Sequence, residues 1–372
     1  MTPATARLAR LHGALALRLA PRAVGRDLPE TAAEGLVRVG FDARALSPST
    51  LGELEHAALA RRDGPGDRRT LLLPREALER ESAEPDGTDE LLAAWDAALQ
   101  PAPAPRLAGV LNLTPDSFSD GGQLNGPDAA VARARELVAA GAHLLDVGGE
   151  STRPGARPVS VADELARVVP TVQALADNGL GPISIDTRRA SVAAAALEAG
   201  ASIVNDVEAG TRDGEMLPLV AETRCGYVAM HMRGDPRDMQ DAPAYVDVVG
   251  EVSEFLRERL AACAAAGIDV ERVWIDPGIG FGKTLEHNLS LLARLGELRS
   301  LGRPLFVGVS RKRFIGVLTD ERDPARRAFG TAGAVAACVA GGSDWLRVHD
   351  VAQMRAAARV ASAVARAGEA ER

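Results

Sequence analysis

The chain has 372 residues, of which 46% are hydrophobic and 25% are charged. These proportions are typical of globular domains, so the chain can bury a sizeable core and is not a disordered polypeptide. The formal net charge of −8 argues against nucleic acid or an anionic membrane as a partner, because such partners need a surface of clustered Lys and Arg.

The first part of the chain is a small α/β segment without recognisable chemistry. Its best candidate for a membrane span, Leu11 to Ala20, is interrupted by Arg18 and is shorter than the ~18 residues that a span needs, so no membrane association is expected. Thr70 to Leu73 predicts a strand and Asp89 to Leu99 predicts a helix.

A proline-rich stretch separates this segment from the rest of the chain. The sequence PAPAP from Pro101 to Pro105 predicts a stiff polyproline spacer. We therefore divide the chain into an N-terminal extension of unknown role (residues 1–100), a linker (101–105) and a main domain (106–372). The main domain has a length that suits an α/β barrel, which commonly uses ~250 residues.

In the main domain, short runs of β-branched and aliphatic residues alternate with helical stretches rich in Ala, Leu and Arg. This alternation predicts parallel strands joined by crossover helices. The helix predicted at Ala190 to Ala199 stops before Gly200, a favourable residue after a helix C-terminus. We predict an α/β fold, a (β/α)8 TIM barrel, whose eight strands end at Asn112, Val147, Asp186, Asp206, His231, Asp276, Ser310 and Val348.

Almost every predicted strand is apolar until its last one or two positions and then presents a polar side chain. In a barrel these positions meet at the C-terminal mouth, where the active sites of this fold lie. Turn formation could explain a few of them, but not the whole set. The polar positions are Asn112, Asp146, Asp186, Asn205, His231, Asp276, Ser310 and Arg347, followed in the chain by Lys312 and His349.

The three cysteines, Cys225, Cys263 and Cys338, are far apart and lie in apolar, Ala-rich surroundings. The sequence has no CxxC motif that would indicate a metal site or a redox pair. We expect core residues in a reducing compartment and hence a cytoplasmic protein.

The acids at the strand ends are better suited to a ligand than to a metal. Asp186 and Asp276 lack the nearby histidines of a protein zinc site. A carboxylate accepts two parallel hydrogen bonds from adjacent N–H groups, and the 2-amino-pyrimidinone edge of a pterin offers such a pair.

Basic residues also gather at the predicted strand ends of this acidic chain. Such a local excess suggests an anionic substrate group, although salt bridges to acids are an alternative. Asn112 would suit a weak Mg²⁺ contact in which the ion keeps most of its waters and bridges phosphate oxygens. The basic residues are Arg153, Lys312, Arg347 and His349.

Two other patterns do not fit their motifs. Gly278 to Thr284 reads GIGFGKT, but a Walker phosphate loop needs a glycine at position 277, where the chain has Pro277. The GxGxxG pattern fails as well, because residue 283 is a lysine. Ser310 and His231 could suggest a hydrolase, but no GxSxG elbow surrounds the serine.

Two long loops follow the first two predicted barrel strands. They span Leu113 to Gly126 and Gly148 to Val159 and are rich in Gly, Pro, Ser and Asp. We expect them to be mobile lids, because they carry Phe118, Asp120 and Arg153 on glycine-hinged segments.

Two segments, GVLNLTPDSFSDGG from Gly109 and LLDVGGESTRPGA from Leu144, resemble the two signatures of the dihydropteroate synthase family. Each is long enough to make a chance match negligible. Further matching segments cover the whole barrel in order. They are SIDT at Ser184, IVNDV at Ile203, MHMRGDPRDMQ at Met230, DPGIGFGKTLEHNL at Asp276, VGVSRKRFIG at Val307 and RVHDV at Arg347.

The resemblance implies a transferase of folate biosynthesis, a sulfonamide target that joins 6-hydroxymethyl-7,8-dihydropterin pyrophosphate to para-aminobenzoate and releases pyrophosphate. It also implies Mg²⁺ as cofactor and a homodimer. By the same resemblance, the pterin is bound by Asp186, Asn205, Asp276 and Lys312, and the pyrophosphate is bound by Thr152, Arg153, Arg347 and His349. The implied para-aminobenzoate pocket contains Phe118, Arg153, Pro154, Phe281 and Ser310. The implied Mg²⁺ is contacted by Asn112.

The implied chemistry agrees with these residue types. An arylamine is uncharged at neutral pH, so its attack needs no strong general base. Pyrophosphate must depart, and Mg²⁺ and cationic side chains can stabilise the charge that builds on the leaving oxygen. We therefore expect catalytic roles for Asp120, Arg153 and Lys312, with Asp120 as the electrostatic partner of a carbocation-like pterin methylene.

Two rival functions are weighed against this one. A pterin-dependent methyltransferase shares the barrel, but the SFSDGG loop and the SRK and RVHD segments favour the synthase. A catalytically silent paralogue is disfavoured because every matched site residue is present. The chain departs from the family in its N-terminal extension and at Glu208, where a small residue is usual; we expect Glu208 to be harmless in a loop.

Overall fold

The computed structural model describes residues 36–42, 60–63, 68–74, 104–113, 126–150, 159–234, 239 and 241–370. The chain divides into two compact units, which we treat separately. One comprises residues 1–101, 246–254 and 294–302, and the other comprises residues 102–245, 255–293 and 303–372. The linker proposed at residues 101–105 stays a prediction.

The described part of the N-terminal extension contains a three-stranded antiparallel sheet. Its strands are β1 (Leu36–Asp42), β2 (Ala60–Asp63) and β3 (Arg68–Pro74), in the order β1-β3-β2. The strand predicted at Thr70 to Leu73 is confirmed within β3. The sequence ARRD of β2 gave no strand signal because a short, charged edge strand lacks the apolar alternation. The helix predicted at Asp89 to Leu99 lies outside the described residues.

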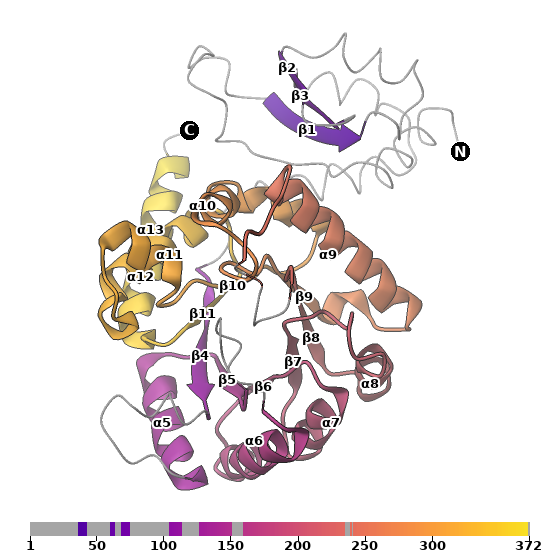
Figure 1. The fold of residues 1–372 in the computed structure, drawn as a ribbon. Helices are drawn as coiled ribbons and strands as arrows, with labels where there is room; N and C mark the ends of the chain where they lie inside the picture. The colour runs from indigo at the N-terminus through magenta and orange to yellow at the C-terminus, as the bar shows by residue number, and fades with distance from the viewer. Residues whose placement is uncertain are drawn as a thin grey trace. The chain divides into compact units, whose positions relative to one another are not determined.

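The main domain is a barrel of eight parallel strands with helices around it (Figure 1), as predicted. The strand order is β10-β11-β4-β5-β6-β7-β8-β9, and a parallel bridge between Ile275 and Leu305 joins the two ends of this series. The strands are β4 (Arg106–Asn112), β5 (Leu144–Gly148), β6 (Ile183–Asp186), β7 (Ile203–Asp206), β8 (Gly226–Met230), β9 (Val273–Asp276), β10 (Phe306–Gly308) and β11 (Trp345–Val348).

Every predicted strand is present, and the predicted ends agree with the observed ones to within two residues. The largest difference is at β10, which ends at Gly308 instead of Ser310. The chain turns there because Arg311 adopts a left-handed backbone conformation with φ of 59°, which a strand does not allow. Ser310 therefore lies in the turn that leads to the next helix.

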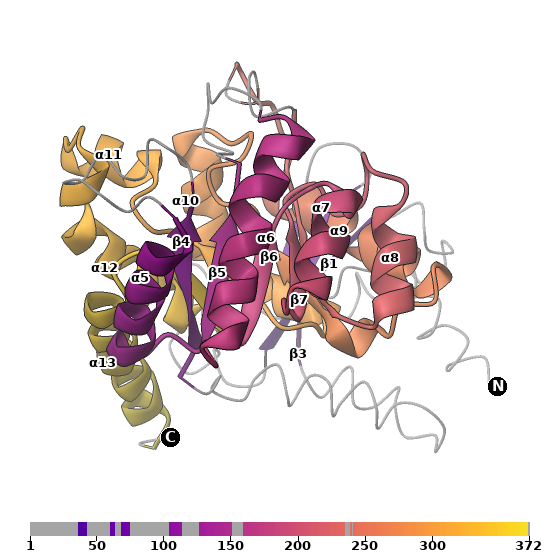
Figure 2. The ribbon, with the colours of Figure 1, turned by 90° about the horizontal axis from the view of Figure 1, so that it is seen from below.

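Helices follow the strands and cover the outside of the barrel, as Figure 2 shows from a second side. The helix predicted at Ala190 to Ala199 is confirmed, and Gly200 follows it with a φ of +115°. The α-helices are α5 (Pro127–Ala140), α6 (Val161–Asp177), α7 (Ala190–Glu198), α8 (Met216–Thr223), α9 (Val248–Ala265), α10 (Leu285–Ala293), α11 (Arg313–Thr319), α12 (Ala328–Ala340) and α13 (Val351–Ala370). Short 3-10 helices are η4 (Val270–Arg272), η5 (Leu295–Leu301) and η6 (Pro324–Arg326).

In the described part of the chain, no helix combines the length and the apolar character that crossing a membrane requires.

The core contains a layer of apolar side chains contributed by seven of the eight barrel strands. Trp274 of β9 stacks on Phe306 and on Trp345, with ring centroids 6.0 and 4.8 Å apart. The remaining members are Ala108, Leu144, Ile203 and Val228. All three predicted core cysteines are buried and free. The barrel interior is therefore packed here, and the polar strand ends lie at a different level of the barrel.

Replacement of Phe306 by alanine should lower the free energy of unfolding of the barrel by about 3–5 kcal/mol, because a fully buried ring is lost. Equilibrium unfolding in urea, followed by tryptophan fluorescence, measures this change. Val364→Ala, at a side chain 68% exposed on α13, is the control and should change stability by less than about 0.5 kcal/mol. Similar losses in both variants would contradict the packing described above.

Candidate active site

A cavity of about 470 Å³ opens at the mouth formed by the C-terminal ends of the strands. Its lining combines polar strand ends with two phenylalanines and several cations. Among the residues predicted for the site, Asn112, Asp186, Phe281, Ser310, Lys312, Arg347 and His349 line it. Asn205 and Asp276 do not line the cavity and are buried beside it.

Arg347 joins acids from two neighbouring strands. Its Nε donates a hydrogen bond to Asp146 Oδ2 at 2.5 Å, and its Nη2 donates to Asp186 Oδ2 at 2.6 Å. Asn205 Nδ2 contacts both carboxylate oxygens of Asp146, at 3.3 and 3.4 Å. Four strand ends, of β5, β6, β7 and β11, are thus linked by a single hydrogen-bonded group.

Asp276 and Lys312 organise the opposite part of the mouth. Asp276 Oδ1 accepts a hydrogen bond from the Gly278 N–H at 2.7 Å, which fixes the start of the turn after β9. Lys312 Nζ donates to the carbonyl of Ile279 in the same turn and lies 4.7 Å from the ring centroid of Phe281. A flat ligand on this side would therefore meet an aromatic face with a cation next to it.

A second lysine, Lys283, lies buried under the same turn. Its Nζ contacts His231 Nδ1 at 2.9 Å and donates to the Phe281 carbonyl at 3.0 Å. His231 is thus a partner of Lys283 and not part of a hydrolytic pair with Ser310. Because Lys283 bonds to protein atoms, the GIGFGKT sequence does not present it to a nucleotide, in agreement with the rejection of a Walker motif.

Ser310, in the turn after β10, and His349, directly after β11, form a polar pair. The His349 N–H donates to Ser310 Oγ at 3.1 Å, and His349 Nδ1 lies 2.9 Å from the same oxygen. Both side chains line the cavity. The turn after β10 and the end of β11 therefore hold each other at the rim.

Burial changes the proton affinity of the groups in this site. It raises the pKa of Asp186 to about 7, although Arg347 acts in the opposite direction. It also raises the pKa of Asp276 against the effect of Lys312, and it lowers the pKa of Lys312 to about 8. Such shifts are characteristic of functional sites, because charges are kept there without full hydration.

Asn112, the predicted magnesium contact, stands at the end of β4 and lines the cavity. The described residues contain no group of three or more His, Cys, Asp or Glu that could hold a metal ion. Gly148 lies beside Asn112, and a Cβ placed on it would be 3.6 Å from both Asn112 Oδ1 and Asp186 Oδ2. This arrangement fits an ion that arrives with a diphosphate and takes one protein oxygen.

Several predicted site residues lie outside the described residues. The predictions for them, and for the two loops that carry them, therefore stay predictions. These residues are Phe118, Asp120, Thr152, Arg153 and Pro154.

Some site residues were missed by sequence reasoning. Asp146 was recognised as a polar strand end but received no role. Glu150 was not considered, and Lys283 was weighed only as part of a phosphate loop that was rejected, although both line the cavity. Asp146 could have been found, since it is the one charged residue in the otherwise apolar run LLDVG. Nothing local indicates the bond from Lys283 to His231, which are 52 positions apart.

A family model described as "Pterin binding enzyme" matches residues 108–349. The fold and the cavity thus belong to a class of barrels named for pterin binding.

Individual relatives define the family more closely. The dihydropteroate synthase of Synechocystis sp. is 46% identical over 256 residues, covering 69% of this chain and 89% of that protein. The dihydropteroate synthase of Escherichia coli (strain K12) is 45% identical over 268 residues, covering 72% of this chain and 94% of that protein. The solved structure of Xanthomonas albilineans dihydropteroate synthase in complex with 7,8-dihydropteroate is 44% identical, with a TM-score of 0.63, and covers 70% of this chain and 93% of that chain. The chain belongs to the dihydropteroate synthase family.

Gly278→Ala should disrupt the turn under the site. Its φ is +64°, and a Cβ there would stand 1.8 Å from the His231 carbonyl oxygen, so backbone must move. Gly267→Ala is the matched control, because Gly267 has a φ of +84° but nothing within 4 Å of its Cβ position. Urea unfolding should show a loss of about 1–2 kcal/mol for Gly267→Ala, from the left-handed conformation alone, and a clearly larger loss for Gly278→Ala. If both variants lose the same free energy of unfolding, the turn at Gly278 accommodates a Cβ without additional destabilisation.

Proposed function

We propose that the chain is a dihydropteroate synthase, a transferase that condenses 6-hydroxymethyl-7,8-dihydropterin pyrophosphate with para-aminobenzoate and releases pyrophosphate. The observation that carries this function is the cavity itself. It brings Asp186 and Lys312, from opposite parts of the mouth, together with Phe281 and with His349 at the rim. The family membership of residues 108–349 supports a pterin as the ligand of this cavity.

The pterin would be bound by hydrogen bonds at the bottom of the mouth and by stacking at its side. Asp186 offers a carboxylate oxygen to the N–H groups of the pyrimidinone edge, and Arg347 Nη2 donates a hydrogen bond to Asp186 Oδ2 at 2.6 Å, which favours the ionised form against the effect of burial. Lys312 Nζ can donate to a ring oxygen or nitrogen while it stays next to Phe281. Asn205 and Asp276 would contribute without lining the cavity. Asn205 holds Asp146 by a hydrogen bond, and Asp276 holds the turn at Gly278.

The reaction requires loss of a diphosphate from the pterin methylene and attack by a neutral arylamine. The described residues contribute by excluding water, by orienting the heterocycle and by placing the charge of Lys312 beside it. When bound, Mg²⁺ would neutralise the charge that develops on the departing diphosphate. Asn112 is the described residue that would contact it.

The residues outside the described part of the chain complete this proposal. We assign pyrophosphate contacts to Thr152 and Arg153 and a place in the para-aminobenzoate pocket to Phe118 and Pro154. Asp120 is the proposed electrostatic partner of the carbocation-like methylene. Support comes from their positions in the two sequence signatures, SFSDGG and GGESTRPGA.

The arylamine pocket would lie where Phe281 and Ser310 line the cavity. The solved Xanthomonas albilineans enzyme that binds 4-aminobenzoic acid covers 70% of this chain at 48% identity. The Yersinia pestis enzyme that binds a sulfonamide drug covers the same share at 42% identity. These likenesses support para-aminobenzoate as a substrate and sulfonamides as competitors for its pocket.

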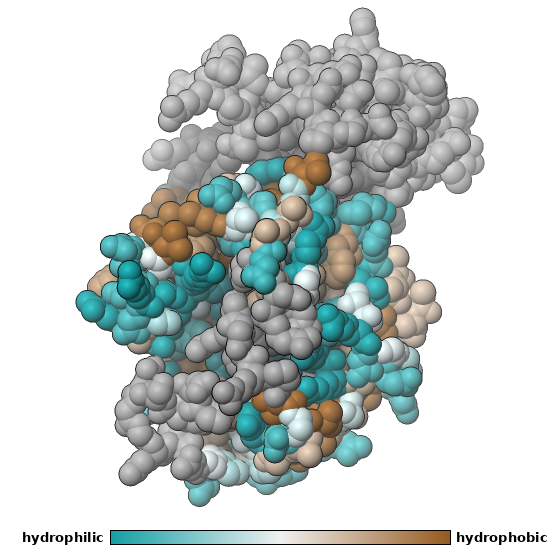
Figure 3. Space-filling view, viewed as in Figure 1, coloured by the Kyte–Doolittle hydropathy of each residue, from teal (hydrophilic) through white to brown (hydrophobic). Residues whose placement is uncertain are grey.

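The assembly and the location of the protein are also proposals. A homodimer is supported by apolar side chains exposed on the neighbouring helices α11 and α12, namely Val317, Leu318 and Phe329, the last 94% exposed. Figure 3 shows hydrophobic residues gathered on the side where Figure 1 draws these helices. A cytoplasmic location is supported by three buried cysteines that remain free thiols.

Incubation of the chain with the pterin pyrophosphate, para-aminobenzoate and Mg²⁺ should yield dihydropteroate and pyrophosphate in equal amounts. Removal of Mg²⁺ by a chelator should stop the reaction, and an excess of Mg²⁺ should restore it. Lys312→Ala should lower kcat/KM by roughly a hundredfold or more, the usual effect of removing an electrostatic contact to the reacting centre. Val360→Ala, at an exposed position of α13, is the control. A wild-type chain that forms no dihydropteroate would refute the proposed function.

The pH dependence should identify the charge on Lys312. Burial lowers the pKa of Lys312 to about 8, so the ammonium group is present below this pH and is lost above it. We expect kcat/KM to fall as the pH rises through about 8. The arginine of Lys312→Arg keeps its charge over this range. In this variant kcat/KM should therefore not fall as the pH rises, even if the variant is slower than the wild type at every pH. If kcat/KM of Lys312→Arg falls with the same midpoint pH as that of the wild type, the group that titrates is not Lys312.

A further inference from the structure

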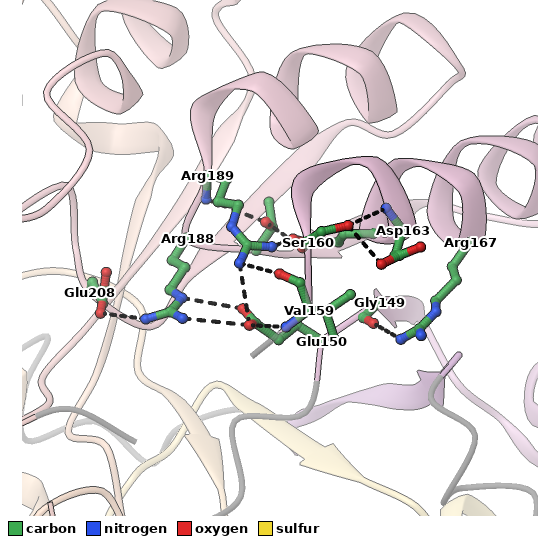
Figure 4. Close-up of polar contacts among 11 residues, drawn as sticks. Gly149, Glu150, Val159, Ser160, Asp163, Arg167, Arg188, Arg189 and Glu208 are labelled. Atoms are coloured by element: carbon green, nitrogen blue, oxygen red, sulfur yellow. Dashed lines mark hydrogen bonds and ion pairs between the residues drawn. The ribbon is translucent and has the colours of Figure 1, made fainter. Parts of the chain in front are cut away.

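A row of buried charges crosses the ends of β5, β6 and β7 (Figure 4). Glu150 follows β5, Arg188 follows β6 and Glu208 follows β7. Arg188 lies between the two acids: its Nε donates to Glu150 Oε2 and its Nη1 donates to Glu208 Oε1, both at 3.2 Å. The Glu150 and Glu208 side chains are only 8% and 4% exposed. Each carboxylate therefore pairs with this guanidinium in a place that has little access to water.

Arg189 extends the row to a point further along the chain. Its Nη2 donates to Glu150 Oε1 at 3.3 Å and to the Val159 carbonyl at 2.7 Å. The Val159 N–H donates to the same Glu150 oxygen at 3.1 Å. Glu150 and Val159 are nine positions apart, and these bonds hold them together as the two ends of the segment 151–158.

The row is balanced in charge. Its acids are Glu150, Glu164 and Glu208, and its cations are Arg188, Arg189 and Arg212, so three negative charges meet three positive ones. Loss of Glu208 would leave three guanidinium groups facing two acids, and Arg188 and Arg189 are only 19% exposed. Truncation of one partner in such a pair is costly because the other charge stays buried.

Hydrogen bonds fix the backbone at Glu208. Its N–H donates to Asp206 Oδ1 at 2.9 Å, and its carbonyl accepts a hydrogen bond from Thr211 Oγ1 at 2.7 Å. Asp206 is itself buried and accepts a hydrogen bond from the Tyr227 hydroxyl at 2.9 Å. The Glu208 side chain therefore starts from a rigid turn, and Arg188 is positioned from β7 as well as from its own strand.

This environment does not agree with the expectation that Glu208 is harmless in a loop. A carboxylate at an indifferent loop position would be solvated, whereas this one is buried and contacts two arginines. Its place in the sequence is one where the family resemblance leads us to expect a small residue. Glu208 thus adds to the mouth a contact that a small side chain cannot make.

We propose that Glu208 is a positioning residue of this chain: by holding Arg188, it fixes Glu150 and Val159, the two ends of the segment 151–158. The inference rests on the proposed function. Glu150 lines the cavity, and the residues assigned to the substrates, Thr152, Arg153 and Pro154, follow it directly in the sequence.

Hydrogen exchange and steady-state kinetics test this role together. In Glu208→Ala, the Val159 amide should exchange roughly tenfold faster than in the wild type, because its acceptor Glu150 is less firmly held. The KM for para-aminobenzoate or for the pterin pyrophosphate should rise roughly three- to tenfold, while kcat changes less than about twofold. Glu222→Ala, at an exposed glutamate of α8, is the control and should change neither value.

Two further variants make the test specific. Glu208→Gln keeps the shape of the side chain and one hydrogen-bond acceptor, so it should show the same changes in weaker form, and it replaces Glu208→Ala should that variant not fold. Because Glu208 acts through Arg188, the double variant Glu208→Ala/Arg188→Met should exchange no faster at Val159 than Arg188→Met alone.

The proposal fails on any of three results in a folded variant. These are an unchanged rate of exchange at Val159, faster exchange with unchanged KM values for both substrates, or additive effects in the double variant. A wild-type chain without synthase activity would refute the proposed function instead. The exchange rates would then still decide whether Glu208 fixes the two ends of the segment.

Discussion

The contact between Arg347 and two acids is the constraint on which the mouth of the barrel depends. Asp146 and Asp186 come from adjacent strands, and the same guanidinium contacts both carboxylates. Two carboxylates in such a place repel each other. Arg347 reaches both from β11 and allows each to accept hydrogen bonds from a ligand or from Asn205. That single guanidinium links the side chains of β5, β6 and β11 at this end, and Asn205 of β7 joins them through Asp146.

The sequence predicted the fold well because the barrel repeats one simple pattern. Each strand is a short apolar run, each crossover is a helix with clear ends, and the polar position at the end of each run is set by where the barrel core stops. Ser310 shows the limit of this reasoning. It reads as the end of the strand LFVGVS, but the left-handed backbone at Arg311 ends β10 two residues earlier, and no local feature of the sequence indicates that conformation.

The partners of the site residues were harder to predict than the residues themselves. Asp186, Lys312 and Arg347 could be identified from their strand ends and from the matching segments. That Arg347 pairs with Asp146, 201 positions away, follows only from the closure of the barrel. The same is true of Lys283 with His231 and of Arg188 with Glu208. Such pairs join side chains across different strand ends, and the order of residues along one strand carries no information about them.

The charges at the bottom of the mouth explain why the loops must contribute to binding. Asp146, Asp186 and Asp276 face Arg347, Lys312 and Lys283, so the acids and the cations nearly cancel. A neutral heterocycle can bind there without adding a net charge to a buried place. The diphosphate tail of the proposed substrate carries charge that this group does not balance, and Arg311 at the rim is already paired with Asp350, at 2.6 Å.

The tail therefore needs cations from outside this balanced group. His349 at the rim, an ion near Asn112 and the arginine at position 153 are the candidates that the sequence and the cavity supply. This division of charge agrees with a reaction in which the heterocycle stays bound while the diphosphate leaves, because the groups proposed to hold the ring are satisfied by one another.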